Sequence, residues 1–445
     1  MPTGAPSGVM TGTVRQVNHA ITIGADIIRR RVPADTPFWR TTPISAAPDL
    51  AAMSPEASLL LAAVRVDAPR VLVDQVLSAP LDWTRVVELT LAHHLAPAMG
   101  RALDAASPGL VPADVLDAFR VYRTRLAAQS GRLTHELAAL LSTFDEQSIF
   151  VVPFKGPVLA QVLFGDVAQR TPGDLDLLVR RADIRRVRQL LVERGYRDID
   201  AVRAGRDLTD AQRRMYERYQ CEYLFVHPDD EVMVEPHWEL CQRTLALDVD
   251  YEGMLDRAGP GMFATRPIRQ LTPDDLLVAL CVHGAKHQWE RLSWVRDVAG
   301  VLATWPGIDL DSLLVRTSDM GCARVLLLSL EVVRRCAGVA LPARVAEAIH
   351  RDPEAEALAS DVVDALFRPR PEPRNDRLEP FRYRMRERRL DRLRYAWLTW
   401  TTPRRRHLEM AALPRAFGWG YYPIKIGADY ALSPLRQIGR RWMSQ

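Results

Sequence analysis

The chain has 445 residues, more than one hydrophobic core usually serves, so its length predicts two or three packed units. A content of 48% hydrophobic and 26% charged residues excludes a disordered chain, a collagen-like repeat and a polytopic membrane protein. The net charge of +4 is too close to neutral for a protein that coats nucleic acid. Because no apolar run approaches the ~20 residues that cross a bilayer and no signal-peptide pattern opens the chain, we expect a cytoplasmic protein.

The near-neutral total hides a strongly basic C-terminal segment. Residues 368–441 hold 19 basic and 7 acidic side chains, so this segment carries +12 and the rest of the chain −8. Nearly all basic residues are arginines; the three lysines are Lys155, Lys286 and Lys425. Tryptophans and tyrosines are interleaved, so the segment could contact an anionic partner such as RNA, an acidic protein or a membrane surface. A solvated extension that packs back on the acidic part of the chain explains it as well, and we favour that interpretation.

Five cysteines are spread along the chain without a Cys-x-x-Cys pair. An odd number does not suit a disulfide framework, and a zinc site needs ligands at short spacings. We therefore expect reduced, mostly buried thiols at Cys221, Cys241, Cys281, Cys322 and Cys336.

The N-terminal third divides into an irregular and a helical part. Six prolines and weak periodicity predict an irregular lead-in over residues 1–50. Helical patterning follows, and Asp82 before Trp83 is a candidate helix cap. We interpret residues 51–148 as a helical domain. Its clearest apolar helix face consists of Leu133, Leu137, Leu140, Leu141 and Phe144.

After Ser148 the pattern changes to short β-rich runs separated by turns. A Lys-Gly pair after the first run predicts a turn into a helix, and two later runs around a Pro-Asp-Asp turn predict a hairpin. We interpret residues 149–270 as an α/β unit. Its predicted elements are strands at 149–152, 175–179, 221–226 and 231–240, and helices at 157–164 and 183–194.

The C-terminal part returns to helical periodicity. Thr272 suits an N-cap and Pro273 the first helical position. Helical patterning continues over residues 271–367, and residues 368–445 form a basic tail without a clear period. The expected fold class is therefore α+β, predominantly helical overall, with a small mixed sheet flanked by N-terminal and C-terminal helical regions.

Two carboxylates, Asp174 and Asp176, flank Leu175 at the start of a predicted strand. Because side chains alternate along a strand, both carboxylates lie on one face, where they repel each other unless a cation lies between them. Oxygen ligands of this kind suit Mg²⁺, which also binds substrate phosphates. Taken alone, an Asp-x-Asp pair is more often a solvated strand end.

Two other motifs supply matching groups. Lys155-Gly156 lies at a strand-to-helix turn, where backbone N–H groups and a lysine can hold phosphate. In the second arm of the predicted hairpin, Glu235, His237 and Glu239 share one face and add a third carboxylate. Each feature is weak by itself, but the ordered set indicates a site for metal and phosphate.

Together these motifs resemble the bacterial uncharacterised branch of the polymerase-β-like nucleotidyltransferase superfamily. The resemblance extends from about residue 55 to about residue 305. It implies a small mixed sheet and the transfer of a nucleoside monophosphate from an NTP such as ATP, with loss of pyrophosphate. The matching stretches are Phe154-Lys155-Gly156, Arg170, Gly173-Asp174-Leu-Asp176, Glu235-Pro-His237-Trp238, and His283-Gly-Ala-Lys286-His287 with Trp289, Arg291, Trp294 and Asp297.

The resemblance also implies roles for single residues. The catalytic and metal-binding carboxylates would be Asp174, Asp176 and Glu235, holding two Mg²⁺ ions, with Mn²⁺ as an alternative. The nucleotide-binding residues would be Lys155, Gly156, Arg170, Gly173, Lys286 and His287, with His237 and His283 in support. Two departures matter: Lys155-Gly156 replaces the superfamily's Gly-Ser or Gly-Gly turn, and the third carboxylate is Glu235 where the superfamily often has aspartate.

A two-metal mechanism is the resulting hypothesis. Asp174 and Asp176 would bridge two ions, and Glu235 would hold the first ion and receive the acceptor proton. Replacing Asp174 or Asp176 with asparagine should then abolish turnover and leave the fold intact.

The helix after Pro273 leaves alternatives open. His283 and His287 continue its apolar face, so they are core histidines, contacts to phosphate or base, or, least favoured, zinc ligands. The resemblance favours Lys286 and His287 facing the nucleotide.

Neighbouring residues are interpreted from their types and spacing. Trp289 and Trp294 are expected to be packing residues. Arg291 and Asp297 are expected to pair on the helix surface. Arg170 either neutralises phosphate or braces its loop.

The function hypothesis is a Mg²⁺-dependent nucleotidyltransferase that modifies a hydroxyl or phosphate of a small molecule, peptide or protein in a biosynthetic or modification pathway. The alternative is a non-catalytic nucleotide-binding or partner-binding scaffold or regulator. Modification of nucleic-acid ends is disfavoured by the modest global charge and the lack of a helix-turn-helix or stacking motif. Neither the base nor the acceptor is specified by the motifs.

Overall fold

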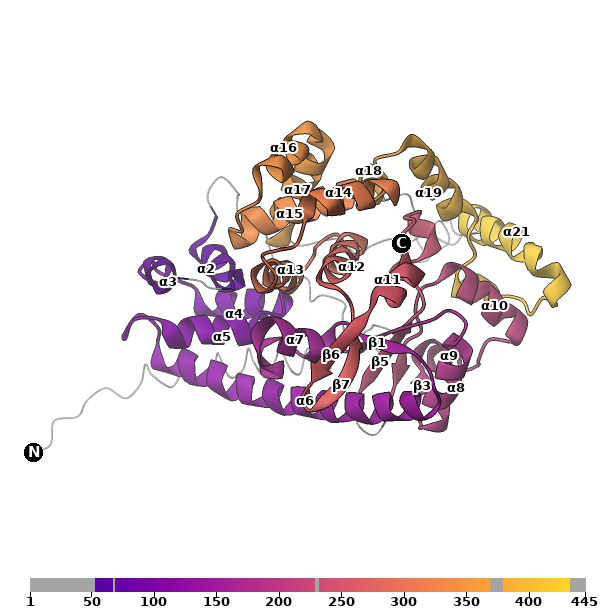
Figure 1. Cartoon of the computed structure of the whole chain (residues 1–445), viewed down its shortest axis with the longest axis horizontal. Helices are drawn as coiled ribbons and strands as arrows, with labels where there is room; N and C mark the ends of the chain where they lie inside the picture. Colours follow the sequence, from indigo (N-terminus) through magenta and orange to yellow (C-terminus); the bar gives the residue numbers. More distant parts are fainter. Residues whose placement is uncertain (1–52, 67–68, 229–231, 369–378, 433–445) are drawn as a thin grey trace, which may run out of the picture.

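The computed structural model describes residues 53–66, 69–228, 232–368 and 379–432, so the predicted lead-in over residues 1–50 lies outside the described residues. Helices dominate and surround a small mixed sheet (Figure 1), which confirms the predicted α+β class. None of the helices in these ranges has the length and apolarity of a membrane span. All five cysteines are free and buried, as expected.

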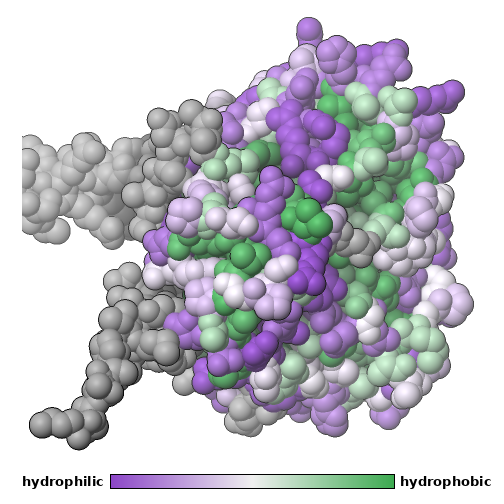
Figure 2. Space-filling view, turned by 90° about the vertical axis from the view of Figure 1, so that its left-hand side faces the viewer, coloured by the Kyte–Doolittle hydropathy of each residue, from purple (hydrophilic) through white to green (hydrophobic). Residues whose placement is uncertain are grey.

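The N-terminal helices begin next to the C-terminal helices and end beneath the sheet (Figure 1). Asp82 caps α4, because its side chain accepts hydrogen bonds from the backbone N–H groups of Thr84 and Arg85. On the side of α2 and α3, hydrophilic and hydrophobic residues are interspersed over the surface (Figure 2). The helices are α2 (Pro55–Val64), α3 (Arg70–Leu77), α4 (Trp83–Ala92), α5 (Ala96–Ala105) and α6 (Ala113–Glu146).

The long helix α6 joins two hydrophobic cores. Near its start, Val115 and Phe119 pack with the N-terminal and C-terminal helices. Near its end, the five apolar residues from Leu133 to Phe144 pack against the sheet, as their shared face predicts. The helix therefore supports both the helical part of the chain and the sheet.

The main sheet has five strands in the order β1-β2-β5-β4-β3. The pair β2–β5 is parallel and the other three pairs are antiparallel, so the sheet is mixed. The strands are β1 (Val151–Pro153), β2 (Leu175–Val179), β3 (Arg197–Asp198), β4 (Phe225–Val226) and β5 (Met233–His237). The helices between them are α7 (Gly156–Phe164), η1 (Val167–Gln169), α8 (Ile184–Glu193), α9 (Ile199–Ala204) and α10 (Asp210–Tyr219).

The hairpin predicted after residue 220 forms, but its first arm is shorter than expected. Regular pairing is confined to β4, while Glu222 makes an isolated bridge to His237. Backbone hydrogen bonds from Tyr223 and Trp238 still tie the preceding stretch to β5. The chain then forms a second hairpin that no sequence pattern had indicated. Its elements are η2 (Arg243–Leu245), α11 (Tyr251–Arg257), β6 (Gly259–Phe263) and β7 (Arg266–Gln270).

The C-terminal helices cover the sheet from above in Figure 1. Thr272 caps the first of them, because its side chain accepts from the backbone N–H of Asp275 as predicted. The helices α13 and α15 contact α2, so N-terminal and C-terminal helices share the larger core. They are α12 (Pro273–Lys286), α13 (Leu292–Thr304), α14 (Leu310–Asp319), α15 (Ala323–Ala337), α16 (Ala343–Arg351) and α17 (Pro353–Leu366).

The described part of the basic tail is helical and lies against the acidic body. Arg405 forms an ion pair with Asp198, 3.5 Å apart, and Gln212 donates to the carbonyl of Ala411 over 3.2 Å. These contacts support the interpretation that the tail packs back on the rest of the chain. Its elements are α18 (Pro380–Arg384), α19 (Arg389–Thr401), α20 (Arg405–Leu408), η3 (Arg415–Gly420), α21 (Tyr421–Ile426) and η4 (Gly427–Leu432).

Candidate active site

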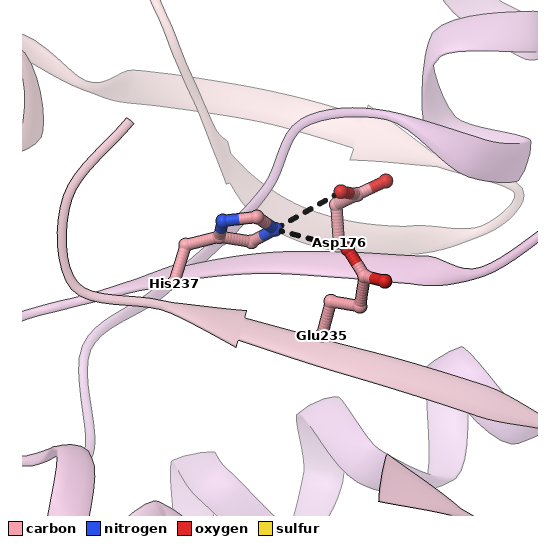
Figure 3. A group of neighbouring side chains, drawn as sticks. All are labelled: Asp176, Glu235 and His237. Atoms are coloured by element: carbon pink, nitrogen blue, oxygen red, sulfur yellow. Dashed lines mark hydrogen bonds and ion pairs between the residues drawn. The ribbon is translucent and has the colours of Figure 1, made fainter. Parts of the chain in front are cut away.

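The parallel pairing of β2 and β5 brings two predicted carboxylates together. Asp176 lies opposite Glu235 in the register, and Leu178 lies opposite His237. Figure 3 shows Asp176 on one strand facing Glu235 and His237 on the next. The alternate residues, such as Leu175 and Val234, point into the core on the other face. Strand alternation thus separates a polar face from an apolar one, as the sequence predicts.

Two positively charged side chains contact the same carboxylate oxygen of Asp176. Its side chain is 2% exposed, and its Oδ1 lies 2.6 Å from Lys155 Nζ and 3.1 Å from His237 Nε2. Burial alone would raise the pKa of Asp176, but Lys155 and His237 hold it well below the usual range. The second oxygen, Oδ2, is buried and has no hydrogen-bond partner among the described residues. Asp176 is therefore an ionised carboxylate with one oxygen available to a ligand.

The other two carboxylates, Asp174 and Glu235, have raised pKa values mainly because they are buried. Burial, together with the charges of Asp176 and Glu235, raises the pKa of Asp174 to about 8. Burial also raises the pKa of Glu235, and repulsion from Glu222 and Asp176 adds to it. Crowded, buried carboxylates of this kind are stabilised when a divalent cation binds between them.

The side chains at this site are of the types that bind a divalent cation. Asp176, Glu235 and His237 each place a nitrogen or oxygen atom within 4.8 Å of the others, and the protonated His237 orients Asp176 by donating to it. The unsatisfied Oδ2 of Asp176 and the nearby carboxylate of Asp174 supply further oxygen donors. The residues therefore fit a hard divalent ion such as Mg²⁺, which prefers oxygen ligands. The sequence had assigned His237 only a supporting place, whereas the structure puts it inside the cluster.

The Lys155-Gly156 turn touches the backbone of the carboxylate strand. Gly156 has φ +60°, and a Cβ there would lie 2.8 Å from the carbonyl oxygen of Asp174. Only glycine allows this approach. No side chain among the described residues caps the N-terminus of α7, whose first-turn residues are buried and include Pro157, which has no N–H. Lys155 itself is buried and directs its charge at Asp176.

Gly156→Ala should lower the rate of any reaction at this site by about 100-fold, since small displacements of reacting groups cost that much. The matched control is Gly165→Ala, because Gly165 has φ +74° but an added Cβ meets nothing within 4 Å. Gly165→Ala should lose about 1–2 kcal/mol of stability from the left-handed backbone, and Gly156→Ala should lose more because its Cβ also meets a backbone carbonyl, as measured by urea unfolding. Equal activities in the two variants would contradict a role for the close contact with Asp174.

Glu222 and Lys286 lie behind His237, and the sequence does not predict a role for Glu222. Glu222 Oε2 lies 3.1 Å from His237 Nδ1 and 2.9 Å from Lys286 Nζ. Burial opposes the charge of His237, but its hydrogen bond with Asp176 and the adjacent carboxylate of Glu222 raise its pKa well above the usual value. Lys286 is therefore linked to the carboxylates through Glu222 and His237. Glu222 and His237 meet through an isolated β-bridge between their strands. The sequence of one strand does not specify its register with the next, so this contact could not be predicted from the sequence.

Glu222→Gln should weaken binding of Mn²⁺ by about 10- to 100-fold, as loss of an outer carboxylate behind a metal site typically does. The physical reason is that Lys286 would be left as an uncompensated positive charge near the cation. Titration calorimetry of purified protein measures the affinity. Glu239→Gln is the control, because Glu239 lies outside the cluster and forms an ion pair with Arg181 at a distance of 3.3 Å. An unchanged Mn²⁺ affinity in Glu222→Gln would refute this role.

The chain matches a family model described as "uncharacterised nucleotidyltransferase" over residues 79–338, more than half of its length. It belongs to this family of nucleotidyltransferases. The matched range contains every site residue predicted from the sequence. No curated protein and no solved structure matches the chain.

In this member of the nucleotidyltransferase family, His283 joins the site and His287 lies beside it. His283 Nδ1 is 3.3 Å from Lys155 Nζ, and the two imidazole centroids are 4.9 Å apart. Burial and the nearby lysine charges lower the pKa of both histidines well below the usual value, so both are neutral. Because an ammonium group can only donate, His283 Nδ1 accepts from Lys155, which does not suit the zinc alternative. Trp289 and Trp294 are buried, as expected of packing residues.

Arg170 braces the segment before β2. Its Nε lies 3.1 Å from both carboxylate oxygens of Asp297 on α13. The expected pair of Arg291 with Asp297 is therefore wrong; Arg291 lies over the ring of Trp294, 5.4 Å from its centroid. The reason is that Asp297 points inward to the loop rather than outward along its helix. Gly173 has open space around it, so the local geometry does not require glycine there.

Proposed function

We propose that this nucleotidyltransferase is a Mg²⁺-dependent enzyme that moves a nucleoside monophosphate from an NTP to a hydroxyl or phosphate acceptor. A new bond would form between the acceptor oxygen and the α-phosphorus, and the bond from that phosphorus to pyrophosphate would break. The observation that carries the proposal is the unsatisfied, buried Oδ2 of Asp176 beside the carboxylates of Asp174 and Glu235.

The three carboxylates would hold the cation. When bound, Mg²⁺ would neutralise phosphate charge and lower the pKa of the acceptor hydroxyl. Lys155 and His237 contribute by fixing Oδ1 of Asp176, which leaves Oδ2 directed at the ligand. Glu235, whose pKa is raised, is suited to receive the acceptor proton.

The nucleotide would lie between the start of α7 and the helix that carries His283. The N-terminus of α7 after Lys155-Gly156, which no side chain among the described residues caps, would face a phosphate oxygen. Among the predicted nucleotide contacts, Arg170 adds positive charge near the carboxylates while bracing its loop, and His287 lies beside His283. Lys286 would act indirectly, by holding Glu222 against His237.

Purified protein incubated with Mg²⁺, host-cell extract and each NTP provides the test. Label on the α-phosphate should appear in an acceptor fraction and label on the γ-phosphate should be released as pyrophosphate. Size and protease sensitivity of the labelled fraction would then distinguish a small molecule from a peptide or protein. Nucleotide binding without transfer of the α-label would instead support the non-catalytic scaffold or regulator.

A further inference from the structure

Helix α19 in the basic tail carries an exposed apolar stripe. The spacing of three, four and three residues places its four large side chains on one helix face. Single exposed apolar residues are common, whereas a continuous row of leucine and tryptophan indicates an interaction surface. The exposed fractions are 77% for Leu390, 64% for Leu393, 66% for Trp397 and 54% for Trp400.

The opposite face of α19 is already anchored to the protein. Tyr395 and Thr399 are buried, and the guanidinium of Arg386 lies 4.0 Å from the centroid of the Tyr395 ring. Arg394 pairs with Asp248 over 2.7 Å. The helix therefore has its packing face filled, and the stripe is a second face that points away from the body.

Neighbouring elements carry further exposed apolar side chains. Helix α21 contacts α19, and both lie at the right-hand edge of the molecule in Figure 1. Phe417 and Trp419 on η3 and Ile426 on α21 are exposed. Aromatic and aliphatic side chains thus gather on this edge of the tail.

The charges exposed beside the stripe are positive. Arg388 and Arg389 are exposed. The acidic residues of the described segment 388–432 are turned inward or paired: Asp391 is buried, Glu409 pairs with Arg405, and Asp429 pairs with Arg406 and Lys425. The outer surface therefore combines apolar side chains with uncompensated basic ones.

We propose that this edge, formed by α19 with η3 and α21, binds the surface of an anionic lipid bilayer. Leucine and tryptophan side chains suit the boundary between headgroups and acyl chains, and arginines suit the lipid phosphates. The convex face of a helix fits a bilayer surface better than it fits an extended peptide, which needs a groove or a free sheet edge. The proposal is independent of the nucleotidyl transfer reaction.

Co-sedimentation with vesicles tests the surface. The full chain should bind vesicles of phosphatidylcholine with phosphatidylglycerol and bind pure phosphatidylcholine at least about tenfold more weakly. Leu393→Glu/Trp397→Glu should abolish the binding, because both charges would enter the apolar boundary. Val71→Glu is the matched control: Val71 is 77% exposed on α3, far from the tail in Figure 1, and this variant should bind like the wild type. Circular dichroism should show unchanged helix content in both variants.

Four results would overturn the proposal. One is a lack of binding by the wild type, and another is undiminished binding by Leu393→Glu/Trp397→Glu. The third is a concentration-dependent dimer that the same double substitution dissociates without any vesicle binding, which would assign the stripe to a second copy of the chain. Binding of single-stranded RNA in place of vesicles would likewise reassign the surface to nucleic acid.

Discussion

Replacing Asp174 with asparagine is expected to lower nucleotidyl transfer by about a thousandfold or more, which corresponds to the several kcal/mol that a bound cation contributes to the transition state. Asparagine keeps the shape of the side chain but removes the negative charge and one oxygen ligand. The rate is measured as release of pyrophosphate from the NTP that labels the acceptor. Glu239→Gln, outside the carboxylate cluster, should keep wild-type activity. Unchanged NTP consumption by Asp174→Asn would refute the assignment.

The same variant should separate catalysis from stability. The pKa of Asp174 is raised to about 8 by burial and by Asp176 and Glu235, so its ionised form is disfavoured in the folded protein. The metal-free wild type should therefore lose stability as the pH rises from about 4 towards 8, through the unfolded and then the folded pKa. At pH 8.5 in EDTA, Asp174→Asn should melt no lower than the wild type. Mn²⁺ should raise the melting temperature of the wild type and leave that of the variant almost unchanged.

Asp176→Asn is expected to destabilise the protein by about 3–5 kcal/mol, the usual cost of removing one partner from a buried ion pair. The sequence alone predicted an intact fold for both asparagine variants. The structure changes that expectation for Asp176, because the substitution would leave Lys155 and His237 buried beside a neutral amide. Urea unfolding measures the loss, and Asp174→Asn serves as the comparison because Asp174 forms no such pair with a described residue.

A double-mutant cycle tests the cause. Asp176→Asn/Lys155→Met should be more stable than Asp176→Asn alone, because methionine removes the buried ammonium and fills similar space. The double variant should remain inactive, since the carboxylate that offers Oδ2 is gone. A loss of less than about 1 kcal/mol in Asp176→Asn, or no recovery in the double variant, would show that the pair is more hydrated than its burial indicates.

These variants also decide between an enzyme and a scaffold. A scaffold that kept only the fold would bind nucleotide, and its binding would be insensitive to Mn²⁺ and to Asp174→Asn. The ionised Asp176 with an open oxygen, the raised pKa of Asp174 and the close turn at Gly156 are the features that a scaffold would not need. An NTP-dependent rise in melting temperature that requires the metal and Asp174 would favour the enzyme.

The sequence by itself determined what depends on local periodicity. Strand alternation placed Asp176 on the polar face of β2, helical spacing identified the core face of α6, and residue type located the caps at Asp82 and Thr272. These features follow from the geometry of a single element, so a few neighbouring residues suffice to predict them.

Only the tertiary structure decided which distant residues meet. Asp176 faces Glu235 because of the β2–β5 register, and Arg170 meets Asp297 across 127 positions of the chain. Glu222 lies behind His237 because the first arm of its hairpin leaves regular pairing at that point. Likewise, the exposed apolar face of α19 could not be predicted, because the sequence of the tail shows no clear helical periodicity. Periodicity tells which residues share a face, but register and packing between elements decide what each face meets, and those depend on the whole fold.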